Sequence, residues 1–197
     1  MTRRAYHHGD LKAALLERAE RTLRERGVEA LSLRELARES GVSPGAPSRH
    51  FRTKQVLLDA LALDGFERLV EAIAVAQGAA GPSFGERLEG MARSYVGFCT
   101  ANAALVELMF SAKHSPEASP ALADAARRWA EQGLELVRAG QERGEVRADP
   151  LDSVALTVFA PLQGYVALAT GGVPLPAGDD RGLGDVIAAI IRACRPD

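Results

Sequence analysis

The sequence predicts an all-α protein, and three features of its 197 residues support this fold class. Alanine and leucine, which favour helices, are abundant, whereas aromatic residues make up only 5% of the chain. Apolar residues recur at helical spacing in one segment after another, and glycine and proline separate these segments. No segment shows the convincing alternation of a β-strand. We therefore expect about nine helices and no sheet.

Composition limits the class of protein further. Hydrophobic residues make up 47% of the chain and charged residues 25%, which is typical of a soluble globular protein. No run of about 18 apolar residues stands out, so we expect no transmembrane helix. The two cysteines, Cys99 and Cys194, form neither a disulfide framework nor a metal-binding spacing. These features favour a cytoplasmic protein.

The net charge of −2 hides an asymmetry along the chain. Residues 1–54 contain twelve Lys and Arg against seven Asp and Glu, a balance of +5, whereas the rest of the chain has a balance of −7. A basic head on an acidic body is typical of a protein whose head meets a polyanion. On charge alone, a randomly charged, solvated surface explains the asymmetry equally well.

Local signals place the ends of the predicted helices. Asp10 can cap the first helix, Thr53 the fourth and Ser119 the seventh. Ser32 with Glu35, and Ser83 with Glu86, have the spacing of a capping box. Gly27, Gly41 and Gly144 can close helices in left-handed turns. The predicted helices cover residues 10–26, 33–41, 44–51, 54–78, 84–102, 103–112, 120–144, 150–171 and 182–194.

Residues 32–51 have the spacing of a helix-turn-helix: two short helices separated by a glycine turn. Ala37 is small enough for a close helix crossing, Gly41 can adopt a positive φ, and Val42 can plug the contact. The second helix would then project its N-terminal residues into a DNA major groove about 12 Å wide. An ordinary helical hairpin has the same spacing, so the motif alone leaves both readings open.

Residues 31–54 read LSLRELARESGVSPGAPSRHFRTK. This string resembles the N-terminal domain of the tetracycline-repressor (TetR/AcrR) family of bacterial transcription regulators, whose pattern is approximately Leu-x-x-Ile-Ala-x-x-Ala-Gly-Val-Ser-x-Gly-x-Leu-Tyr-x-His-Phe-x-x-Lys. The glycine, the cap serine, the His-Phe pair and the trailing lysine all fall in register. The resemblance covers about residues 8–70 and implies a DNA-binding domain at 1–54, a connecting helix at 54–78 and a ligand-binding, dimerising domain at 79–197.

The resemblance also implies a set of DNA contacts. Ser43 caps the recognition helix and can donate to a phosphate, while Arg34 and Lys54 contact phosphates and so position the domain. Arg49 either reads a base or is simply solvated. The implied DNA-binding residues are Arg34, Ser43, Pro44, Gly45, Ala46, Ser48, Arg49, His50, Thr53 and Lys54.

Two residues depart from the family pattern. Ser48 stands where the family usually has a tyrosine, which removes a large ring that contacts phosphate or base. Pro47 falls inside the predicted recognition helix, where it cannot donate a helical hydrogen bond. We therefore expect the helix to start nearer Gly45 and the affinity for DNA to be weaker than is usual in the family.

The second domain shows a mixture of apolar, aromatic and polar residues that suits a ligand pocket, although core packing explains each member separately. In one subgroup of the family a late helix carries a Trp and, four residues later, His-Gly; here Phe159 and Gln163-Gly164 occupy those places. Pro161 lies between them and should kink the helix. The candidate pocket residues are Phe98, Cys99, Asn102, Met109, Phe110, Trp129, Phe159, Gln163 and Tyr165.

The last two predicted helices are apolar enough to form a dimer interface, as the resemblance implies. The alternative is that both are core helices of a monomer. The candidate interface residues are Leu156, Ala160, Gly164, Ala167, Leu183, Ile187, Ile190 and Ile191.

The sequence contains no nucleophile elbow, no phosphate-binding glycine loop and no His-Glu pair at metal spacing, so we expect no catalysis, metal or cofactor. We expect a homodimeric repressor that binds double-stranded DNA at a palindromic operator and is released by a small-molecule effector, without a membrane partner. The competing hypothesis is an all-helical ligand-binding protein or enzyme whose DNA-binding head is degenerate.

Overall fold

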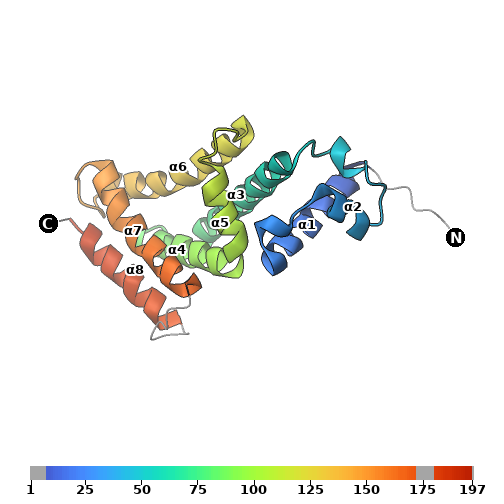
Figure 1. Ribbon diagram of the computed structural model, residues 1–197. Coiled ribbons are helices and arrows are strands. Elements are labelled where there is room, and N and C mark those ends of the chain that lie inside the picture. The colour runs from blue at the N-terminus through green and yellow to red at the C-terminus, as the bar shows by residue number, and fades with distance from the viewer. Residues whose placement is uncertain (1–7, 172–179, 197) are drawn as a thin grey trace. The chain divides into compact units, whose positions relative to one another are not determined.

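The computed structural model describes residues 8–171 and 180–196. This part of the chain contains eight α-helices, two short 3₁₀ helices and no strand (Figure 1). The all-α prediction is therefore confirmed. The α-helices are α1 (His8–Arg26), α2 (Leu33–Glu39), α3 (Lys54–Ala79), α4 (Phe84–Ala101), α5 (Ala103–Ala112), α6 (Pro120–Glu142), α7 (Leu151–Thr170) and α8 (Asp180–Cys194), and the 3₁₀ helices are η1 (Val28–Ala30) and η2 (Pro47–Arg49).

The chain divides into two compact units that interleave along the sequence. The first unit comprises the chain up to Phe66 together with Asn102–Asp124. The second comprises Glu67–Ala101 together with the chain from Ala125 onward. The helices α3 and α6 each contribute one part to either unit. The functional division at residues 54 and 79 is a different kind of boundary and stays a prediction.

In the first unit, α1 packs against α2 and α5. Buried apolar side chains, among them Leu15, Leu36 and Phe51, form its core. At the start of α6, the Asp59 carboxylate of α3 accepts hydrogen bonds from the backbone N–H of Ser119 at 2.8 Å and from its hydroxyl at 2.7 Å. The Ser119 Oγ in turn accepts from the backbone of Leu122 at 3.1 Å, so Ser119 caps α6 as predicted.

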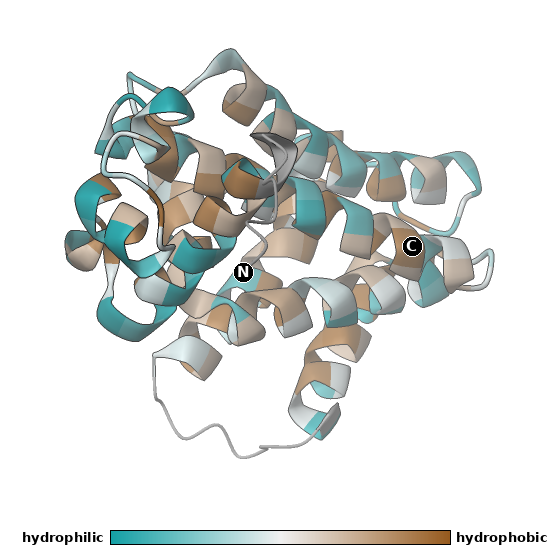
Figure 2. Cartoon of the chain, turned by 90° about the vertical axis from the view of Figure 1, so that its right-hand side faces the viewer, coloured by the Kyte–Doolittle hydropathy of each residue, from teal (hydrophilic) through white to brown (hydrophobic). Residues whose placement is uncertain are grey.

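In the second unit, α7 packs against α4 and α8, and α4 also packs against α8. Leu88, Val158 and Ile187 are among the buried side chains of these three helices. Hydrophobic and hydrophilic residues are interleaved along the helices (Figure 2).

The predicted helix ends are confirmed in most places. Gly27, Gly41 and Gly144 have positive φ, between 65° and 77°. At the start of α4, the backbone of Ser83 donates to the Glu86 carboxylate at 3.1 Å and the backbone of Glu86 donates to Ser83 Oγ at 3.3 Å, which is a complete capping box.

Three predicted caps are wrong. Ser32 is the N-cap residue of α2 but makes no side-chain cap hydrogen bond, and the Glu35 carboxylate pairs with Arg38 and not with the backbone of Ser32. Asp10 lies inside α1, which begins at His8. Ser43 caps no α-helix, because none begins after it.

The predicted α-helix over residues 44–51 is also wrong, which accounts for the count of eight helices instead of nine. The segment forms a turn and the 3₁₀ helix η2. Pro47 has no N–H, so it cannot form the α-helical bond to the Ser43 carbonyl. That carbonyl accepts from the backbone of Ala46 at 2.9 Å, an i to i+3 bond, and the Pro47 carbonyl accepts from His50 at 2.9 Å and from Phe51 at 2.8 Å.

The expectation that no segment is apolar enough to span a membrane needs correction. The helix α7 is long and apolar enough to cross a membrane by length and composition, with a mean hydropathy of 1.4. However, α7 packs against α4 and α8, as a core helix of a globular domain does. The helix runs from Leu151 to Thr170 without a break at Pro161. Only 28% of this apolar window is buried within the chain, which leaves much of its surface uncovered.

Candidate functional site

The turn segment, residues 43–51, presents most of its predicted DNA-binding residues to solvent. Ser43, Pro44, Gly45, Ser48 and Arg49 are exposed. In contrast, Ala46 and His50 are half-buried, and Pro47 and Phe51 are buried. Pro47 and Phe51 therefore anchor the segment, while residues 43–45 and 48–49 remain exposed.

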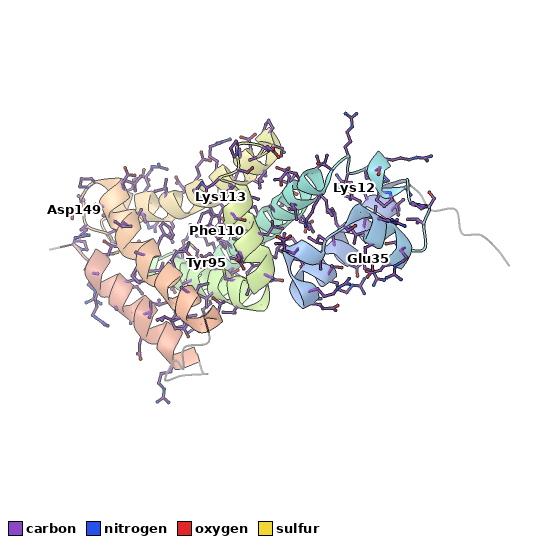
Figure 3. All side chains as sticks on the ribbon, in the orientation of Figure 1. Lys12, Glu35, Tyr95, Phe110, Lys113 and Asp149 are labelled. Atoms are coloured by element: carbon purple, nitrogen blue, oxygen red, sulfur yellow. The ribbon has the colours of Figure 1, made fainter. Side chains whose placement is uncertain are left out.

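Exposed guanidinium groups surround this segment. Arg34 on α2, Arg49 on η2 and Arg52 just before α3 are exposed, and within the described residues none of the three has an acidic partner. Two other arginines of the same unit are paired: Arg26 donates to Glu39 at 2.8 Å, and Arg38 pairs with Glu35, which is labelled in Figure 3. The three unpaired arginines are the groups best placed to meet an external anion.

The two remaining predicted contacts are less freely available. Lys54 lies 3.9 Å from a carboxylate oxygen of Glu29, whose side chain is almost fully exposed, so this ion pair is weak. Thr53 is exposed, but its hydroxyl accepts from the backbone of Val56 at 3.2 Å and so caps α3. Arg52 did not stand out in the sequence, because a single arginine carries no signal until its exposure is known.

The second unit contains a cavity of about 290 Å³ among α3, α4, α6 and α7. Its wall is almost entirely apolar, and within this wall there is no Asp, Glu, Lys, Arg or His. The lining residues are Ile73, Met91, Tyr95, Trp129, Ala130, Gln132, Gly133, Leu134, Phe159, Leu162 and Gln163. A mostly apolar wall with a few polar groups is typical of a small-molecule site.

Aromatic rings form one part of the wall. Tyr95, on α4 (Figure 3), stacks on Trp129 with the ring centroids 6.3 Å apart and the planes inclined by 28°. Gly133 provides the space for a third ring, since a Cβ atom there would lie 2.3 Å from Cζ of Phe159. Replacement of this glycine would therefore displace the Phe159 ring.

A short polar chain runs from this wall into the core. The Tyr95 hydroxyl donates to Oε1 of Gln163 and is also hydrogen-bonded to the Cys99 thiol. Burial raises the pKa of Tyr95 above its usual range, and the neighbouring thiol adds to this shift. Burial also raises the pKa of Cys99 to about 11. Both groups are therefore neutral at physiological pH.

Gln132 provides the other polar group of the wall. Its Nε2 donates to the backbone carbonyl of Val70 in α3 at 3.1 Å. Because a carbonyl only accepts, this bond fixes which end of the amide is nitrogen and which is oxygen. The Oε1 atom is buried and has no hydrogen-bond partner among the described residues. A buried acceptor without a partner is energetically costly.

The structure brings three of the nine predicted pocket residues together at the cavity: Trp129, Phe159 and Gln163. The first unit contains three others: Asn102 precedes α5, Met109 packs against Gly65, and Phe110 lies edge-on to Phe66 and 4.5 Å from Nζ of Lys113 (Figure 3).

The remaining three predicted pocket residues belong to the second unit but do not line the cavity. Phe98 lies under the guanidinium of Arg68, Cys99 is fully buried behind Tyr95, and Tyr165 is half-buried on α7. Helical periodicity cannot separate a wall residue from a core residue, because both lie on the apolar side of a helix. For the same reason the sequence pattern does not single out Met91 and Tyr95, which also line the cavity.

Sequence profiles connect these two units with known proteins. A profile of bacterial regulatory proteins of the tetR family matches residues 15–61, which include the helix-turn-helix. A profile of the tetracyclin repressor-like C-terminal domain matches residues 88–193, which include most of the cavity wall. The chain belongs to the TetR family. It is therefore a DNA-binding transcription regulator and not an enzyme.

Solved structures agree with this assignment. The chain is 38% identical to a protein of unknown function from Rhodococcus sp. RHA1, with coverage of 98% of this chain and 99% of that one and a TM-score of 0.90. It is 25% identical to the TetR family transcriptional regulator PfmR from Thermus thermophilus, with coverage of 90% and 97% and a TM-score of 0.68.

A bacterial regulatory protein in the tetR family from Rhodococcus RHA1 shares the fold, with 22% identity, coverage of 93% and 96% and a TM-score of 0.73. A search of curated proteins finds no match.

The candidate interface residues of this TetR family chain fall into two groups. Leu156, Ala160, Gly164 and Ala167 all lie on the exposed side of α7, and Leu156 is 67% exposed. Leu183, Ile187 and Ile190, in contrast, are buried within the chain itself, and Ile191 is half-buried beside Gly85. The apolar stripe of α8 faces α4 and α7 of its own chain, so it forms core where the sequence suggested a surface.

Proposed function

We propose that this TetR family regulator is a repressor that binds a palindromic operator as a cytoplasmic homodimer and is released by a small-molecule effector. The observation that carries this proposal is the pairing of two features in one chain. The first unit exposes unpaired arginines around a helix-turn-helix, and the second unit contains an apolar cavity.

The arginines support DNA binding through the phosphate backbone. Arg34, Arg49 and Arg52 leave water and counterions for phosphate at little cost, because no carboxylate among the described residues competes for them. Apart from Arg49, the exposed residues of the turn segment have small side chains: Ser43, Pro44, Gly45 and Ser48. Small side chains permit close approach of the backbone to the floor of a major groove. We therefore assign positioning to the arginines and sequence reading to the turn.

The exposed side of α7 supports a homodimer. Leu156 and Leu168 are 67% and 43% exposed on a helix whose apolar window is only 28% buried. Ala160 and Gly164 lie on the exposed side and are small enough to let a second helix approach closely. A twofold dimer through this side would cover the apolar surface and place two recognition segments for half-sites about 34 Å apart.

One helix supports communication between the two sites. The helix α3 begins at Lys54, directly after the turn segment, and Ile73 near its other end lines the cavity. Gln132 holds the Val70 carbonyl of the same helix. An effector that shifts α3 would alter the spacing of the two recognition segments, and a differential affinity of about 1–3 kcal/mol between two states is enough for useful coupling.

Selection of bound fragments from random DNA, followed by a salt titration and a footprint, tests the proposal. We expect one enriched palindrome, a protected footprint over it and a steep fall in affinity as the salt concentration rises. Addition of the effector should then release the fragment.

A second candidate function has one specific observation in its favour. The recognition segment is a 3₁₀ turn that lacks the family's tyrosine at Ser48, so the head could have lost its operator while the cavity still binds a ligand. Salt-sensitive binding that is blind to sequence, with no enriched fragment, would favour this ligand-binding protein over the repressor.

A further inference from the structure

The cavity of the second unit opens to solvent beside α6 and α7. Ala130 on α6 and Gln163 on α7 line the cavity and are exposed, whereas its other lining residues are buried or half-buried. We call the opening beside these two residues the mouth. In the single chain, an occupant of the cavity is therefore in contact with water at the mouth.

Gln163 also belongs to the exposed side of α7. Leu156, Ala160, Gln163 and Ala167 follow one another at positions i, i+4, i+7 and i+11, which is the spacing of one side of an α-helix. All four are exposed. The mouth therefore opens onto the same side of α7 that we propose as the dimer interface.

The composition of this side suits a second copy of the same chain. From Ser153 to Thr170, α7 contains no charged residue. In a twofold interface the same patch of both subunits meets itself, so a charge near the axis would face its own copy and be repelled. An uncharged side with Leu156 at 67% exposure has surface to cover and no such repulsion.

Gln163 connects this side of α7 with the interior of the cavity. Its Oε1 accepts a hydrogen bond from the hydroxyl of Tyr95, and the Tyr95 ring stacks on Trp129 in the cavity wall. One end of the Gln163 side chain is thus held by the wall, while the residue itself is exposed. A subunit that packs against Gln163 would form the outer limit of the same wall.

We infer that the partner subunit closes the mouth, so that the effector site is complete only in the homodimer. This inference rests on the proposed homodimer and on the proposed role of the cavity as the effector site. Its consequence is reciprocal: the dimer binds an occupant of the cavity more tightly than the monomer does, and a bound occupant stabilises the dimer.

The fluorescence of Trp129 tests the closure, because this is the only tryptophan of the chain and it lines the cavity next to Ala130. Leu156→Asp changes a residue that does not line the cavity and that lies seven residues before Gln163, about 10 Å along the helix. We expect this variant to be monomeric and to raise the Stern–Volmer constant for acrylamide quenching severalfold. Val75→Asp, the matched exposed position on α3, should leave the constant unchanged.

Cysteine labelling tests the mouth directly. Ala130→Cys places a thiol at the mouth, and Ala123→Cys, on the same helix but outside the cavity wall, is the control; both alanines are exposed. We expect N-ethylmaleimide to label Ala130→Cys severalfold more slowly than Ala123→Cys, and the two at similar rates once Leu156→Asp is added. If Leu156→Asp fails to fold, dilution of Ala130→Cys until sedimentation shows a monomer gives the same comparison.

A monomeric Leu156→Asp variant with unchanged quenching of Trp129 overturns the inference and leaves the proposed dimer standing. Rapid labelling of Ala130→Cys in a chain that sediments as a dimer does the same. A dimeric Leu156→Asp variant removes the α7 interface itself, and this inference with it.

Discussion

Individual side chains around the turn segment divide into those that hold it and those that are available to a partner. Pro47 and Phe51 are buried and fix its conformation, while Arg34, Arg49 and Arg52 are exposed and unpaired among the described residues. Arginine is suited to phosphate because its planar fork can donate two hydrogen bonds at once. A short 3₁₀ turn can therefore expose small side chains beside arginines without a regular recognition helix.

Replacement of one of these arginines gives a prediction specific to phosphate contact. Arg34→Ala should weaken binding to all DNA sequences about equally and reduce the slope of log affinity against log salt by about one. The matched variant Arg138→Ala, on α6 and paired with Glu135, should leave the slope unchanged. An unchanged slope in Arg34→Ala would remove Arg34 from the interface.

The cysteines lead to a second prediction at this scale. Cys99 is fully buried and burial raises its pKa to about 11; burial also raises the pKa of Cys194. Since the thiolate is the reactive form, neither thiol should react quickly with maleimide in the native protein at pH 7.5, and both should react after unfolding in urea. Rapid native labelling of Cys99, followed by mass spectrometry, would contradict this and would revive a redox role.

Two carboxylates accept hydrogen bonds at the N-terminus of α4. Glu86 accepts from the backbone and the hydroxyl of Ser83, and Glu145, from the segment after α6, accepts from the backbone of Phe84. The hydrogen bonds from Ser83 lower the pKa of Glu86, and the backbone hydrogen bond of Phe84 lowers that of Glu145. Both carboxylates lie where the dipole of α4 favours negative charge.

This arrangement predicts how stability responds to acid. A carboxyl whose pKa is lowered by folding stabilises the protein above its ordinary pKa of 4.5, and this contribution is lost as the pH falls through the lowered value. The melting temperature of the double variant Glu86→Gln, Glu145→Gln should therefore fall less between pH 6 and pH 3 than that of the unaltered chain. An equal fall of the melting temperature in both proteins, measured by circular dichroism, would contradict the lowered pKa values of Glu86 and Glu145.

The same helices show what sequence patterns can and cannot predict. Apolar periodicity located all eight α-helices, because burial of one side of a helix requires it. The capping box at Ser83 was found, whereas that at Ser32 does not form and Glu35 pairs with Arg38. The helix over 44–51 failed at Pro47, whose missing N–H outweighed the family pattern.

The candidate sites were less predictable than the helices. The turn segment could be proposed as the DNA contact because its residues are contiguous in the sequence, and this assignment stays a prediction. The cavity draws its wall from four separate helices, so only Trp129, Phe159 and Gln163 were identified in advance. Exposure separates Leu156 from Ile187, although both are apolar residues at helical spacing.

At the scale of the whole molecule, the exposed side of α7 is an apolar surface that the single chain leaves uncovered. Leu156→Asp would place a charge in the centre of the proposed dimer interface, and we expect it to yield a monomer of 20.9 kDa by sedimentation and to abolish operator binding. The matched variant Val75→Asp replaces an equally exposed apolar residue, 62% exposed on α3, and should remain dimeric. A dimeric Leu156→Asp variant would rule out this interface.

The selection of bound fragments from random DNA tests the central claim most directly. The account predicts that the purified chain enriches one palindromic sequence with half-sites about 34 Å apart, and that binding falls steeply with salt. Recovery of random fragments without any shared motif, at low salt and with a dimeric, folded protein, would contradict it.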